Sequence, residues 1–111
     1  MAVVVWSALL VVAACIPGPS VPLPAGSDLG FHAVGYAVHA LLVFAAVRHG
    51  RPVGRSAMIA VVAAVSLGVA TEALQGTVPG RQPSVADGFA DAVGAVLGAS
   101  AGRALLVRGD A

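Results

Sequence analysis

Lysine is absent from this chain, and charge of either sign is scarce. Only 10% of the 111 residues are charged, as six arginines and five acids, and the net charge is +1. So little charge, spread along the sequence, excludes nucleic acid as a partner. Cysteine is nearly absent as well, because Cys15 stands alone and cannot form an internal disulfide. The chain is instead 59% hydrophobic, above the roughly 45–50% of soluble domains, which indicates a membrane protein.

Four apolar runs account for the mean hydropathy of +0.95. A helix needs about 20 apolar residues to cross a bilayer, so four spans with short loops use the whole chain as one domain, residues 1–111. The predicted spans are residues 2–16, 29–47, 56–74 and 86–107. The sequence therefore predicts an all-α integral membrane bundle of about four transmembrane helices.

Arginine positions predict how this bundle lies in the membrane. Five of the six arginines fall in the loop after the second run or at the end of the fourth: Arg48, Arg51, Arg55, Arg103 and Arg108. Short cytoplasmic loops carry an excess of positive charge. We therefore expect a multi-pass protein of the cell membrane with both termini cytoplasmic and with the linkers 17–28 and 75–85 outside.

The first apolar run is short and admits a second interpretation. Val12-Ala13-Ala14-Cys15 resembles a bacterial lipoprotein cleavage box, and a signal peptide is also a short apolar run. A signal peptide needs a basic segment before its apolar stretch, however, and nothing charged precedes this one. We therefore favour a retained helix, in which Cys15 is a small apolar residue.

Ionisable residues inside membrane segments are costly, which makes them candidates for function. Each of the last three runs places such residues on one helical stripe near the predicted outer face. They are Asp28 and His32 with Tyr36 beside them, then Glu72 and Gln75, then Asp87 and Asp91. Arg81 lies in the linker at the same depth, whereas His39 lies deeper and is expected to be a hydrogen-bonded packing residue. We therefore expect three helices and one linker to form a single polar site.

Small residues form a second pattern on the fourth run. Gly94, Gly98 and Gly102 recur every four residues. Glycines at this spacing let helix backbones approach closely in lipid. We assign these three glycines to helix packing.

Two interpretations of the polar residues stay open. In the first, His32 and Glu72 are proton donor and acceptor, and Arg81 holds an anionic group such as a phosphate or carboxylate. In the second, Arg81 neutralises Glu72, Asp87 or both in a structural ion pair. No metal-ligand motif of recognised spacing is present, so we predict no metal and no cofactor.

Two motifs give the sequence a resemblance to the VanZ-like family of prokaryotic membrane proteins. The first is Asp28-x3-His32-x3-Tyr36. The second is Glu72-x2-Gln75-x3-Pro79-Gly80-Arg81-x2-Ser84-x2-Asp87, followed by Asp91, Gly94 and Gly98. The match covers roughly residues 20–102, with two departures. The family usually has lysine where Leu29 stands and asparagine where Asp91 stands, so this site is more acidic than is typical.

The resemblance implies an architecture and candidate residues but no established activity. The family is named for a member associated with low-level resistance to the glycopeptide teicoplanin. Applied position by position, the resemblance adds Ser84 to the residues already selected. As candidates we take His32, Glu72, Asp28 and Asp87 for catalysis, and Arg81, Gln75, Tyr36, Ser84 and Asp91 for ligand binding.

The leading functional expectation is a cell-envelope protein whose outer site binds an anionic membrane lipid or a lipid-linked wall precursor. If the protein is an enzyme, it would also modify this ligand. The alternative is a non-enzymatic interaction module. In that case the polar cluster is an ion-pair lock, and the glycine faces dock a second copy or a larger envelope protein. A proton or solute pathway is disfavoured because only His39 lies deep in the predicted bilayer.

Overall fold

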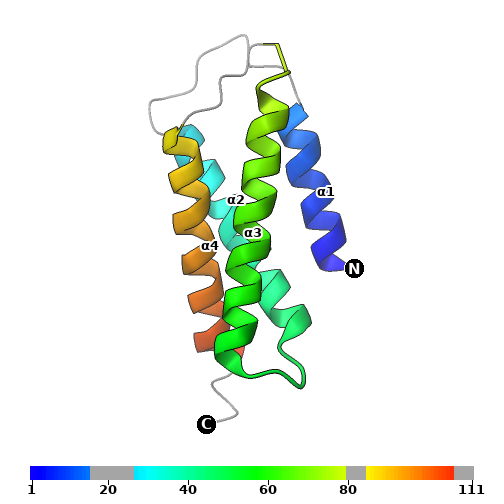
Figure 1. The fold of residues 1–111 in the computed structure, drawn as a ribbon, viewed down its shortest axis with the longest axis vertical. Coiled ribbons are helices and arrows are strands. Elements are labelled where there is room, and N and C mark those ends of the chain that lie inside the picture. Colours follow the sequence, from blue (N-terminus) through cyan, green and yellow to red (C-terminus); the bar gives the residue numbers. More distant parts are fainter. Residues whose placement is uncertain (16–26, 80–84, 107–111) are drawn as a thin grey trace.

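The computed structural model describes residues 1–15, 27–79 and 85–106, and their regular structure is entirely helical (Figure 1). The helices are α1 (Ala2–Cys15), α2 (Ser27–Val47), α3 (Val53–Gln75) and α4 (Val85–Leu106). Three of them, α2, α3 and α4, are long and apolar enough to cross a membrane. The predicted all-α fold is therefore confirmed for this part of the chain, with three helices that could cross a membrane.

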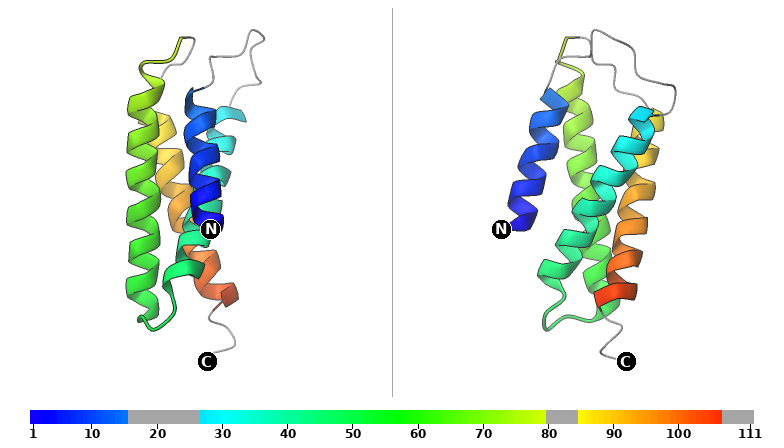
Figure 2. Two further views of the ribbon diagram at one scale, coloured as in Figure 1. Left: turned by 90° about the vertical axis from the view of Figure 1, so that its right-hand side faces the viewer. Right: turned by 180° about the vertical axis from the view of Figure 1, so that it is seen from behind.

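Helix α1 differs from the other three in length. Its 14 residues extend about 21 Å at 1.5 Å per residue, less than the roughly 30 Å thickness of a bilayer's hydrocarbon core. It packs on α2 and α3, and the N-terminus lies about midway along the bundle (Figures 1 and 2). Residue 16, the predicted end of this run, lies outside the described residues. Three helices are thus long enough to cross a membrane, and the predicted first span is a shorter apolar helix whose crossing stays a prediction.

Two hydrogen bonds fasten α1 to α2. The indole Nε1 of Trp6 donates to the carbonyl oxygen of Gly35 at 2.8 Å. His39 is buried, and its Nε2 lies 3.0 Å from the hydroxyl of Ser7. These contacts agree with the packing role expected for His39, and they show how a short helix is held against the bundle.

The third helix begins three residues earlier than predicted. Pro52 directly precedes Val53 and has φ −58° and ψ 143°. Proline tolerates the start of a helix because the first amide groups there have no intrahelical partner. The chain turns into this position through Gly50, whose φ of 72° suits glycine. The loop between α2 and α3 is therefore shorter than the sequence pattern indicated.

Helices α2 and α4 are the most closely packed pair. A Cβ atom placed on Gly94 or Gly98 would collide with the backbone carbonyl of Ala33 or Ala37, respectively. Further along, a Cβ on Gly102 would lie 2.9 Å from the ring of Phe44. The glycines thus let α4 lie directly on the backbone of α2, which is the close approach expected of small residues in lipid.

Arginines gather at one end of the bundle, where α2 and α4 end and α3 begins (Figure 1). Arg48 Nη1 donates to the carbonyl oxygen of Leu106 at 2.6 Å, and Arg51 Nη1 donates to that of Val47 at 2.8 Å. The last carbonyls of a helix have no intrahelical partner, so these arginines cap the ends of α4 and α2. We call this the arginine end.

Candidate functional site

The predicted polar residues come together at the opposite end of the bundle. There α2 and α4 begin and α3 ends, because the three long helices run alternately up and down (Figure 1). His32 lies in the second turn of α2, Glu72 lies in the last turn of α3, and Asp87 and Asp91 lie one turn apart near the start of α4. The helix directions alone thus bring one polar stripe from each helix to the same depth.

His32 links α2 to α4. Its Nδ1 lies 2.7 Å from Asp91 Oδ1, and its Nε2 lies 3.9 Å from Asp87 Oδ2. Both aspartates are buried, with Asp91 only 2% exposed. The imidazole ring therefore lies between two carboxylates, and an ionised Asp91 accepts a hydrogen bond from Nδ1–H. This contact fixes the orientation of the ring.

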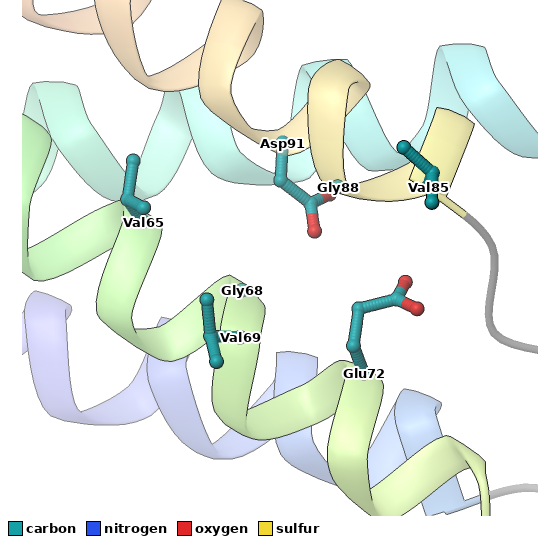
Figure 3. A pocket seen from close by; sticks show the side chains of 7 residues that line it. All are labelled: Val65, Gly68, Val69, Glu72, Val85, Gly88 and Asp91. Atoms are coloured by element: carbon teal, nitrogen blue, oxygen red, sulfur yellow. The ribbon is translucent and has the colours of Figure 1, made fainter.

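Glu72 brings a third carboxylate to the same place from α3. One ligand atom each of His32, Glu72 and Asp91 lies within 4.8 Å of the others. The carboxylates of Glu72 and Asp91 point toward one another from α3 and α4 (Figure 3). We call His32, Glu72, Asp87 and Asp91 the His32 cluster. Three acids and one imidazole make it an acidic site.

Asp91 has one carboxylate oxygen that the cluster does not satisfy. Its Oδ2 is buried and has no hydrogen-bond partner in the described part of the chain. A glycine makes room for it, since a Cβ on Gly68 would lie only 3.0 Å from this oxygen. Buried polar atoms are nearly always hydrogen-bonded, and leaving one unpaired is costly. An unpaired oxygen here points to a group that the protein binds.

Tyr36 supports the cluster through a hydrogen-bonded chain. Its hydroxyl lies 2.5 Å from Thr71 Oγ1, and Thr71 in turn donates to the carbonyl oxygen of Gly68 at 3.0 Å. Tyr36 is therefore the donor to Thr71. Its ring lies nearly parallel to that of His32, with centroids 6.5 Å apart. This arrangement makes Tyr36 a buried support beside His32, while its predicted ligand-binding role stays a prediction.

Thr71 is a buried polar residue beside the cluster that sequence reasoning missed. It lies three residues after Gly68 and four before Gln75, so its position on the polar face of α3 was readable from the helix period. Gln75 itself is buried, at 6% exposure. Polar residues at 71 and 75 thus extend the face of α3 that Glu72 borders.

A pocket opens beside the cluster between α3 and α4. Its volume is about 380 Å³, and its walls are Val65, Gly68, Val69, Glu72, Val85, Gly88 and Asp91 (Figure 3). Val69 and Val85 are 66% and 78% exposed, so the pocket opens on the outer surface of the bundle. Apolar walls next to two carboxylates suit a ligand with an apolar part and a polar part.

Three predicted site residues cannot be placed in this geometry. Arg81 and Ser84 lie outside the described residues. Asp28 belongs to the first turn of α2, and its side chain lies outside the described part of the chain as well. The anion-holding role of Arg81 and the roles of Ser84 and Asp28 therefore stay predictions.

Comparison with known proteins does not identify the site. The chain matches no protein-family model, no curated protein and no solved structure. The resemblance to the VanZ-like family therefore stays a prediction that rests on the motifs from Asp28 to Gly98.

Proposed function

We propose that this chain is a VanZ-like membrane protein of the cell envelope that binds an amphipathic lipid in the pocket between α3 and α4. The observation behind this proposal is the pocket itself, which has valine walls and the carboxylates of Glu72 and Asp91 side by side. A lipid tail fits against Val65, Val69 and Val85, and its head group then lies at the His32 cluster. The proposed class of ligand is a lipid-linked phosphate, such as a cell-wall precursor.

The head group is proposed to be anionic because of Arg81. An arginine pairs strongly with a phosphate through charge-assisted hydrogen bonds. It would also offset the acids of the His32 cluster, which by themselves repel an anion. If the protein is an enzyme, His32 exchanges a proton with the ligand while Asp91 holds its ring, at the contact of 2.7 Å. If it is not, the same residues only bind.

The proposed orientation places the arginine end in the cytoplasm and the His32 cluster outside. With α1 as a fourth crossing, both termini are cytoplasmic, although its 14 residues then require local thinning of the bilayer. Single cysteines at Ala2, Ser27, Gly50 and Gly109, in a Cys15→Ala background, test this by labelling intact cells from outside. Labelling at Ser27 alone supports the proposal. Labelling at Gly50 and Gly109 contradicts it, and labelling at Ala2 shows that α1 does not cross.

Lipid binding is tested with a fluorescent polyprenyl phosphate and with the corresponding alcohol, which has the same tail and no anion. Gly88 lines the pocket and has open space around it, so Gly88→Leu fills the pocket without a clash. We expect it to weaken binding of both probes at least tenfold, or about 1.4 kcal/mol. Gly54 also has open space around it but lies far from the pocket, which makes Gly54→Leu the matched control. Unchanged binding in Gly88→Leu would reject the pocket.

Arg81→Ala tests binding of the head group separately from binding of the tail. A charge-assisted hydrogen bond contributes about 1.5–3 kcal/mol, so this variant should weaken binding of the phosphate about 10–100-fold and leave binding of the alcohol unchanged. Equal affinity of this variant and the unmodified protein for the phosphate would remove the anion from the proposal.

A structural lock is the second candidate function. The contact between His32 Nδ1 and Asp91 Oδ1 joins α2 to α4, the same two helices that the glycines bring together. In a lock, His32→Asn and Glu72→Asp should lower the folded amount of protein and its ligand binding together. In a binding site they should abolish binding while the folded amount stays normal.

A further inference from the structure

We propose that His32, Glu72 and Asp91 bind a divalent transition-metal ion of the first row, such as Zn²⁺. The proposal concerns the His32 cluster alone and does not depend on the lipid ligand proposed above. It also revises the expectation from the sequence, in which no metal site was foreseen.

The first step is geometric. One ligand atom from each of the three residues lies within 4.8 Å of the other two. Around a tetrahedral Zn²⁺, with bonds of about 2.1 Å, any two ligand atoms lie about 3.4 Å apart. An ion bound by Nδ1 of His32 and Oδ2 of Asp91 would lengthen the present contact of 2.7 Å between Nδ1 and Oδ1, and Glu72 would move in. The ligand atoms need to move by about 1 Å, and rotation about side-chain torsions supplies this without moving a helix.

The second step is the unpaired oxygen of Asp91. Asp91 is 2% exposed, and its Oδ2 has no hydrogen-bond partner in the described part of the chain. The carboxylate points across the pocket toward Glu72 (Figure 3). Gly68 leaves the room that this orientation needs, because a Cβ there would press on Oδ2 at 3.0 Å. A bound cation satisfies this oxygen and offsets the cost of burying it.

The third step is the chemistry of the ligands. One imidazole nitrogen with two carboxylates suits Zn²⁺, Mn²⁺, Fe²⁺ or Co²⁺. Ca²⁺ binds six to eight oxygens and Mg²⁺ prefers octahedral oxygen coordination, so neither fits a site that contains an imidazole. Copper(I) selects sulfur ligands, which the cluster does not contain.

Asp87 completes the arrangement as an outer partner. A histidine that binds a metal through one ring nitrogen generally donates the other N–H to a carboxylate or carbonyl. Here Nδ1 faces Asp91, and Nε2 faces Asp87 Oδ2 at 3.9 Å. A modest rotation of Asp87 makes this a hydrogen bond, which orients the ring for coordination.

Metal binding is measured on the full chain, purified without a histidine tag in detergent and stripped with a chelator. Equilibrium dialysis against Zn²⁺ should show one saturable ion per chain, and Co²⁺ should give the visible absorption of a low-symmetry nitrogen and oxygen site. Loss of an outer-shell partner costs about 10–100-fold in affinity, which is the loss expected for Asp87→Asn. His32→Gln and Asp91→Asn should each lose more than that. Absence of saturable binding to the unmodified protein overturns the proposal.

Two controls keep the test specific. His49 is exposed in the loop at the arginine end, and His49→Gln should bind Zn²⁺ as the unmodified protein does. Among small residues, Gly68→Ala should weaken binding by displacing Asp91, whereas Gly54→Ala, on the same helix with open space around it, should not. A Gly68→Ala protein with unchanged affinity, or an Asp91→Asn protein that is helical by circular dichroism and still binds one ion, contradicts the assignment.

The same experiment distinguishes the metal from a lock made by Arg81. A site that binds Zn²⁺ through the three proposed ligands keeps or gains affinity in Arg81→Ala, because a competing positive charge is removed. Loss of Zn²⁺ binding in that variant, with the helices intact, would contradict the ligand set. Because the probe is the metal alone, failure of the lipid experiments leaves this result unaffected.

Discussion

The two ends of the bundle use ionisable residues in opposite ways. At the His32 cluster, side chains from α2, α3 and α4 point inward, and Asp87 and Asp91 are buried. At the arginine end, Arg48 and Arg51 donate to the last carbonyls of α4 and α2. Capping satisfies groups that every helix end exposes, so it gives those two arginines a role that needs no ligand. No such general need explains a buried cluster of acids around an imidazole, which is why function is sought there.

The two ends also differ in what the glycines of α4 contact. Gly94 and Gly98 face the backbone of α2, whereas Gly102 faces the side chain of Phe44. Backbone cannot move aside without shifting a whole helix, while a side chain can rotate. The packing of α2 and α4 is therefore more rigid toward the His32 cluster than toward the arginine end.

The largest effect is expected from substitutions in this stripe. Gly98→Ala should lower the free energy of unfolding by about 3 kcal/mol, at the upper end of overpacking effects, because its Cβ meets the carbonyl of Ala37. Gly102→Ala should cost about 1 kcal/mol, since the ring of Phe44 can adjust. Unfolding by SDS in mixed micelles, followed by circular dichroism, measures both. Equal losses would show that the packing does not differ between the two ends.

Much of this architecture could be predicted from sequence because a bilayer constrains it strongly. Long apolar runs predicted α2, α3 and α4, with ends that the structure moved by no more than three residues among those described. Alternating helix directions then predicted that His32, Glu72 and Asp91 would lie at the same depth. The first run, predicted as residues 2–16, forms the 14-residue helix Ala2–Cys15, and apolar composition alone does not show whether so short a helix crosses the bilayer.

The side-by-side contacts between the helices could not be predicted from the sequence. Which residue faces which depends on how the helices are rotated and ordered around the bundle, and no local spacing encodes this. The pairing of Tyr36 with Thr71 and the space that Gly68 leaves for Asp91 are both of this kind. So is the proposed metal site, because its three ligands come from three helices and form no sequence motif.

An intermediate effect is expected from Thr71, which lies on the polar face near the cluster. Thr71→Val leaves the buried hydroxyl of Tyr36 without its acceptor and should cost about 1–3 kcal/mol in unfolding free energy. Thr77 bonds to the carbonyl of Leu74 on the exposed surface, so Thr77→Val should cost less than about 0.5 kcal/mol. Adding Tyr36→Phe to Thr71→Val should restore part of the loss, because no hydroxyl is then left unpaired. If the double variant is as unstable as the sum of the two single variants, the hydrogen bond is not the cause.

The smallest effect is expected at the arginine end. Arg48→Ala removes the bond to the carbonyl of Leu106 and a positive charge beside the C-terminus of α4, together worth about 0.3–1 kcal/mol. Arg55 is exposed in the first turn of α3, where a positive charge is not favoured by the helix dipole, so Arg55→Ala should cost less. Unfolding in mixed micelles at low and high salt measures the difference, which should shrink as salt screens the charge. If Arg48→Ala lowers the free energy of unfolding as much as Thr71→Val does, the arginine end contributes as much to stability as the polar face near the His32 cluster.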